Sequence, residues 1–178
     1  MLYNVAQLLK APVGSDLRQT IAGKIDLRDA DVVVVAPVTG EVRFQRTNQG
    51  ILATGAADTV VRLQCVRCLE DFEQPLHIKF SEMFLPTVEV LSGHPMPPIT
   101  DDLGFPIDAR HHLDLTEMLR QQIILDLPDQ PLCRADCAGI CPVCGNNRNV
   151  TPCTCETQED QRWAALTHLT LDDVPSEN

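Results

Sequence analysis

The feature that most constrains this chain is its set of eight cysteines. They are spaced as Cys65-x-x-Cys68, then Cys133-x3-Cys137-x3-Cys141-x-x-Cys144, then Cys153-x-Cys155. The first residues have neither the basic nor the apolar stretch of a secretion signal, which disfavours a disulfide framework. Cysteines two apart can present two thiolates to one tetrahedral ion, so the pattern predicts zinc.

The spacing allows two divisions of the cysteines between ions. In the division that we favour, one ion is held by Cys141, Cys144, Cys153 and Cys155, and a second by Cys65, Cys68, Cys133 and Cys137. The second set spans 64 intervening residues and would staple the first half of the chain to the second. In the other division, Cys133, Cys137, Cys141 and Cys144 hold one ion and the rest are weakly held or free. The expected cofactor is therefore one or two zinc ions.

Sequence signatures of catalysis are absent. The chain lacks His-Glu-x-x-His, Gly-x-Ser-x-Gly, Gly-x-Gly-x-x-Gly and a phosphate-binding loop ending in Gly-Lys-Ser/Thr. None of its five histidines has a glutamate two residues later, as the zinc deaminases require. A zinc ion with four thiolate ligands also has no open position for water or substrate. We expect a protein that is not an enzyme and has no small-molecule substrate.

The net charge of −11 is concentrated in the second half of the chain. Residues 1–85 carry nine basic and ten acidic side chains, whereas residues 86–178 carry five and fifteen. Nucleic-acid affinity comes largely from Lys and Arg that release counterions, so this balance favours a basic partner protein. An arginine-bearing sheet face that binds RNA directly stays open as an alternative, with Arg43, Arg46, Arg62 and Arg67 as its candidate residues.

Membrane insertion is not expected, because no apolar run approaches the roughly 18 residues of a membrane span. With no secretion signal either, the sequence predicts a cytoplasmic protein. This expectation agrees with the metal interpretation of the cysteines, since cytosolic thiols stay reduced.

Hydrophobic periodicity predicts an α+β fold. Strand-like alternation runs from Val32 to Phe84, with the first cysteine pair in a turn between two strands and with Gly40, Asn48–Gly50, Gly55 and Asp58 as turn residues. Short helical spacing occurs over residues 4–10. Asp114 is a predicted N-cap of a longer helix that Pro128 ends, and a final helix is expected near 157–169. The expected architecture is an antiparallel β meander or partly closed barrel with one or two packed helices and a zinc-ribbon-like segment.

Three segments are expected along the chain, packed as one compact unit. Residues 1–85 form a mainly β domain that carries the first cysteine pair. Residues 86–106 contain five prolines and no period, which indicates a linker or loop. Residues 107–178 contain the longer helix, the cysteine-rich zinc segment and the C-terminal helix, packed on the β part.

The combined motifs resemble a known family. They are Val5 to Lys10, Cys65-Val-Arg-Cys68 with Phe72, Leu113-Asp-Leu115 leading to Pro128, and Pro131-Leu-Cys133 to Cys144-Gly-Asn-Asn. This order is similar to that of the YceD family, described as large ribosomal RNA subunit accumulation proteins. The resemblance implies a role in ribosome biogenesis through 23S rRNA accumulation, with the large-subunit precursor contacted through a ribosomal protein or the rRNA. It also implies that all eight cysteines are the family's cysteines.

Overall fold

The computed structural model of the chain describes residues 1–27, 32–97, 104–155 and 162. These residues divide into two compact units. The first consists of Met1–Val66 and Glu70–Cys133, and the second of Arg67–Leu69 and Arg134–Asn178. Every helix and strand named below belongs to the first unit, whereas the described part of the second is built from turns and one isolated bridge between Ile140 and Asn147.

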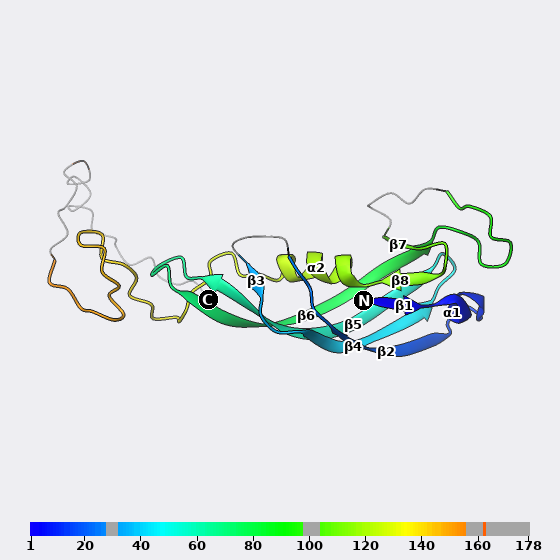
Figure 1. The fold of residues 1–178 in the computed structure, drawn as a ribbon, viewed down its shortest axis with the longest axis horizontal. Coiled ribbons are helices and arrows are strands. Elements are labelled where there is room, and N and C mark those ends of the chain that lie inside the picture. The colour runs from blue at the N-terminus through cyan, green and yellow to red at the C-terminus, as the bar shows by residue number, and fades with distance from the viewer. Residues whose placement is uncertain (28–31, 98–103, 156–161, 163–178) are drawn as a thin grey trace, which may run out of the picture. The chain divides into compact units, whose positions relative to one another are not determined.

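The first unit is an eight-stranded sheet with two helices (Figure 1). Neighbours in the sheet follow the order β1-β8-β7-β6-β5-β4-β2, and β3 pairs with β5. The helices are α1 (Ala6–Lys10) and α2 (Thr116–Leu125). The strands are β1 (Leu2–Asn4), β2 (Asp16–Gly23), β3 (Val33–Val34), β4 (Val38–Arg46), β5 (Ile51–Gln64), β6 (Asp71–Pro86), β7 (Phe105–Ile107) and β8 (His112–Asp114).

The sheet curls into half of a barrel. Its two edge strands approach each other at Tyr3, whose hydroxyl donates to the carbonyl of Thr20 at 2.9 Å. The Tyr3 ring also packs against Phe44 of β4, with ring centroids 5.2 Å apart. These contacts and the strand-rich architecture confirm the predicted α+β fold with a partly closed barrel.

The core lies on the concave face because side chains alternate along the long strands. In β5, odd-numbered residues such as Ala57 and Val61 are buried, whereas even-numbered residues such as Thr54 and Arg62 face outward. Helix α2 packs against β6 and contributes Met118, Leu119 and Ile123 to the core. Each fully buried Leu, Ile or Phe contributes about 1.5–3 kcal/mol of transfer free energy.

Three residues that were predicted to mark turns lie inside strands. Gly40 is in β4, and Gly55 and Asp58 are in β5, whereas Asn48–Gly50 forms a loop as expected. The glycines are needed for close packing of neighbouring strands: a Cβ on Gly40 would lie 2.1 Å from the carbonyl oxygen of Ala56. A strand-interior glycine of this kind marks close backbone approach, not a chain reversal.

Helix α2 begins two residues later than the expected N-cap. Asp114 is the last residue of β8, and its carboxylate accepts the backbone N–H of Thr116 at 2.9 Å. The helix ends at Leu125, before Leu127 and the predicted stop at Pro128. The short helix expected over residues 4–10 is confirmed as α1, and the one expected near 157–169 falls outside the described residues apart from Arg162.

Both ends of the proline-rich segment 86–106 belong to the sheet. Pro86 is the last residue of β6, and β7 pairs with the end of β6 in parallel, with Phe84 opposite Phe105. The two phenylalanine rings stack with centroids 5.4 Å apart. None of the described helices combines the length and the apolar character that a membrane crossing requires.

Candidate metal centres

The first cysteine pair occupies the turn between β5 and β6, as the sequence predicted. Gln64 and Asp71 are the last paired residues of the two strands, and the loop between them contains Cys65 and Cys68. The backbone N–H of Cys65 donates to the carbonyl of Glu70 at 2.9 Å. Leu69, directly after the second cysteine, has a left-handed φ of 60°. The long hairpin therefore holds two thiols at its tip.

The pair Cys141 and Cys144 repeats this backbone geometry. The N–H of Cys141 donates to the carbonyl of Asn146 at 2.9 Å, which is the same separation of five residues as between Cys65 and Glu70. Gly145 follows the second cysteine with a left-handed φ of 74°, as Leu69 does in the first turn. Two segments with different surroundings thus form the same Cys-x-x-Cys knuckle, a turn that presents two thiolates to one ion.

The thiols gather into two groups of four. The first group is Cys65, Cys68, Cys133 and Cys137, and the second is Cys141, Cys144, Cys153 and Cys155, with the sulfurs of each group within 4.8 Å of one another. Tetrahedral zinc with Zn–S bonds of about 2.3 Å places its sulfurs roughly 3.8 Å apart, so both groups fit the ion with small side-chain movements. This grouping coincides with the division that we favoured from the sequence.

The two groups differ in exposure to solvent. Cys65, Cys68 and Cys137 are buried and Cys133 is half-buried, whereas Cys144 and Cys155 of the second group are exposed. A buried thiolate group needs a cation to offset the loss of hydration. The first group is therefore shielded, while the second is accessible to chelators and oxidants.

Hydrogen bonds in the second knuckle favour a thiolate at Cys141. The backbone N–H groups of Cys144 and Val143 stabilise the ionised sulfur and lower the pKa of Cys141 to about 6. A hydrogen bond to the sulfur of Cys141 raises the pKa of Cys153. A hydrogen bond to the sulfur of Cys144 raises the pKa of Cys155 to about 12. Four crowded sulfurs cannot all ionise without a cation, and a divalent metal removes this conflict.

Asn149 organises the cysteine-rich segment of the second unit. Its Nδ2 donates to the sulfur of Cys137 at 3.3 Å, and its Oδ1 accepts from the N–H of Ala138 at 2.8 Å and from Arg134 at 2.6 Å. Such partners orient a metal ligand and tune its charge. Sequence reasoning missed this role, because the link between residues 137 and 149 appears only in the folded segment.

The four arginines proposed as an RNA-binding set have separate environments. Arg43 lies on β4 and pairs with Asp16 at 3.2 Å, while Arg62 lies on β5 and pairs with Glu73 at 3.5 Å. Arg43 is opposite Thr54, eight residues along β5 from Arg62, which separates the two arginines by about 27 Å. Arg46 donates to the carbonyl of Thr47 at 2.6 Å, and Arg67 donates to the carbonyl of Cys137 at 3.1 Å.

Fold and thiol geometry together define a β-rich protein with two knuckle-type four-cysteine groups, a donor set suited to structural zinc and not to catalysis at an open metal position. Residues 53–170 match the family model described as "Large ribosomal RNA subunit accumulation protein YceD". The chain belongs to the YceD family. The resemblance inferred from the cysteine and leucine motifs is thereby confirmed.

Several curated proteins are similar to this chain. An uncharacterized protein of Mycobacterium leprae is 27% identical over 140 residues, which cover 79% of this chain and 62% of that protein. An uncharacterized protein of Mycobacterium tuberculosis is 29% identical over 133 residues, with coverages of 72% and 60%. A chloroplastic Zea mays protein named large ribosomal RNA subunit accumulation protein YCED homolog 1 is 27% identical over 154 residues, with coverages of 73% and 52%.

The matched region spans only part of these relatives, between 52% and 62% of their length in the three cases above. No solved structure matches the chain. The family name supports a role in ribosome biogenesis.

Proposed function

We propose that this protein is a non-enzymatic factor that supports accumulation of 23S rRNA and assembly of the large ribosomal subunit in the cytoplasm. The observation that carries the proposal is the family match over residues 53–170, together with the name of the Zea mays relative. In this role the protein needs neither a small-molecule substrate nor a membrane. It binds a precursor particle and stabilises it.

Zinc, in one or two ions, serves a structural role in this proposal. The ligands are Cys65, Cys68, Cys133 and Cys137 for one ion and Cys141, Cys144, Cys153 and Cys155 for the other. When bound, each ion supplies charge compensation for four thiolates and fixes the knuckle turns. Binding energy of this kind is also folding energy, so the metal stabilises the segment that carries it.

The proposed partner on the precursor is a basic ribosomal protein. Support comes from the charge of residues 86–178, where acidic side chains outnumber basic ones by ten. Complementary charge speeds association and selects against acidic competitors. Among the described residues, Asp126 and Asp129 are exposed after α2 and belong to this acidic half.

The test is recovery of tagged protein from fractionated ribosomal precursors in cells that lack the untagged copy. We expect the protein in large-subunit precursor fractions and a reduced level of 23S rRNA when it is absent. Replacement of Asp126 and Asp129 by Lys should weaken the association most at low salt, where exposed charges are least screened. Normal 23S rRNA without the protein would contradict the proposed role.

A second candidate is direct contact with RNA, and nuclease treatment separates the two. A protein partner remains attached after the RNA is digested, whereas a direct RNA contact is lost. The observation that favours RNA is the pair Arg18 and Arg43, which lie opposite each other on β2 and β4 on the convex face of the sheet.

A further inference from the structure

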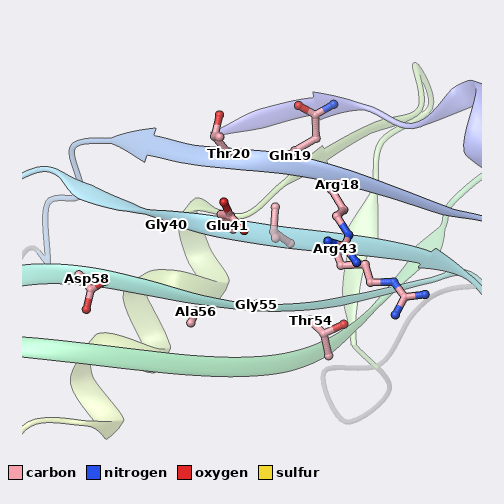
Figure 2. Close-up of a pocket in the computed structure, with 11 residues that line it drawn as sticks. Arg18, Gln19, Thr20, Gly40, Glu41, Arg43, Thr54, Gly55, Ala56 and Asp58 are labelled. Atoms are coloured by element: carbon pink, nitrogen blue, oxygen red, sulfur yellow. The ribbon is translucent and has the colours of Figure 1, made fainter.

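The convex face of the sheet carries an open groove across β2, β4 and β5, with a volume of about 750 Å³ (Figure 2). Its floor contains Gly40, Gly55 and Ala56, so the backbone of the sheet is close to solvent there. Arg18 and Arg43 project at one end of the groove, and Asp58 lies towards the other (Figure 2). The groove thus has two arginines at one end, and its lining also includes the carboxylates of Glu41 and Asp58.

Arg18 and Arg43 lie directly opposite each other on neighbouring strands. Directly opposed side chains have Cβ atoms about 4.5–5.5 Å apart, and like charges at such positions destabilise a sheet. The one carboxylate that pairs with Arg43 is Asp16, at 3.2 Å, and the described parts of the chain place no acidic group within ion-pair distance of Arg18. This end of the groove therefore holds two cations and the Asp16 carboxylate, and Glu41, two residues from Arg43 on the same face of β4, also lines the groove.

Hydroxyl groups extend the arginine pair into a row of hydrogen-bond donors. Thr54 of β5 is opposite Arg43, and Ser81 of β6 is opposite Thr54. Arg18, Arg43, Thr54 and Ser81 consequently cross four adjacent strands on one face, a span of about 14 Å at a strand spacing of roughly 4.8 Å. Planar guanidinium groups beside hydroxyl donors match the oxygens of a phosphate group.

We propose that the Arg18–Arg43 end of this groove binds the phosphodiester backbone of RNA. The proposal rests on the proposed function, which places the protein on a large-subunit rRNA precursor. The groove's lining contains no aromatic side chain on which a base could stack, and its donors suit phosphate oxygens. The contact positions the RNA and does not read its sequence.

The small side chain of Ala56, which faces outward on β5, keeps the floor of the groove low. A sugar-phosphate chain can therefore approach the sheet while Arg18 and Arg43 reach it from one side. A bound phosphate also relieves the repulsion between the two arginines, so binding and stability of the sheet are linked.

The experiment measures binding of a fluorescent 12-nucleotide single-stranded RNA to the full chain over a range of salt concentrations. Arg18→Gln should lower the affinity about fivefold to tenfold at low salt and flatten the slope of log affinity against log salt by about 0.7, the change expected for one lost phosphate contact on a single strand. Asp16→Asn should raise the affinity, because it frees Arg43. Arg62→Gln is the matched control, since Arg62 faces outward on β5 but lies about 27 Å from Arg43.

Thermal unfolding of the same variants separates a binding effect from misfolding. Arg18→Gln should melt at the same temperature as the parent chain or higher, because it removes a like-charge pair. The inference is overturned if the parent chain does not bind the RNA, if Arg18→Gln and Arg43→Gln leave affinity and salt slope unchanged, or if polyglutamate competes as well as RNA. If one of these results is found and the protein still associates with the precursor, only the groove contact is overturned. A normal level of 23S rRNA in cells that lack the protein overturns the proposed function.

Discussion

Replacement of Gly40 by alanine tests how β4 and β5 pack against each other. A Cβ at this position would lie 2.1 Å from the carbonyl oxygen of Ala56 and 2.6 Å from the Cα of Ala57, whereas real Cβ contacts do not fall below 3.0 Å. Strands β4 and β5 must therefore separate locally by about 1 Å, which lengthens neighbouring ladder hydrogen bonds beyond their usual 2.7–3.2 Å range.

The cost follows from the number of weakened bonds. Loss of two or three buried backbone hydrogen bonds costs about 1–1.5 kcal/mol each, and the reduced entropy of the unfolded alanine chain offsets about 0.4–1 kcal/mol. The free energy of unfolding should therefore fall by about 1–4 kcal/mol. For a chain of this size, that corresponds to a decrease in melting temperature of roughly 2–16 °C.

Urea unfolding followed by circular dichroism measures this change, with Thr39→Ala as the control. Thr39 is the preceding residue of β4 and is exposed, so its truncation should change the free energy of unfolding by less than about 1 kcal/mol. A Gly40→Ala variant as stable as Thr39→Ala would refute the packing argument.

Four further results are expected. Purified protein should contain two zinc ions per chain by elemental analysis, and one ion with four titratable thiols would reject the two-site division. Cys68→Ser should lower the melting temperature under reducing conditions far more than Arg148→Leu, because Arg148 is exposed and Cys68 is a proposed ligand. Asn149→Ala should weaken zinc binding at the site containing Cys137 by about 10–100-fold in a chelator competition assay, and an unchanged affinity would exclude the orienting role. The backbone N–H of His112 lowers the pKa of Asp108, so the stability that this carboxylate contributes is present above its unfolded pKa of 3.8 and is lost as pH falls below that value. Asp108→Asn should therefore reduce the acid dependence of the melting temperature. An identical pH profile for the variant and the parent chain would contradict this.

Local sequence patterns were sufficient for the long strands and the cysteine groups. Alternation around Val42–Phe44 and Val61–Leu63 reflects one buried face, and this pattern requires no knowledge of neighbouring strands. Cysteine spacing likewise encodes which pairs can share an ion. The division between two groups was favoured from the sequence because the cysteines of 141–155 can close one site locally, which leaves one quartet for the other site: Cys65, Cys68, Cys133 and Cys137.

Features that depend on distant neighbours were not predictable. Strand β2 has one buried residue, Ile21, because it is an edge strand, and it therefore lacks an apolar alternation. Gly40 and Gly55 resembled turn residues, since the strand crowding that requires them comes from another part of the chain. The position of Arg18 opposite Arg43 depends on the register of β2 with β4, which no local pattern specifies.

The pairing of β1 with β8 has a consequence for how the chain folds during synthesis. Leu2 is opposite Asp114, so β1 has no neighbour in the sheet until more than a hundred further residues have been made. The hairpins joining β4, β5 and β6 have short connections and can form earlier, because closing a short loop costs less entropy. Until β8 is made, the backbone N–H and C=O groups of β1 lack their sheet partner, so the growing chain carries an unpaired strand while residues 86–114 are synthesised, and an unpaired strand can pair with other chains.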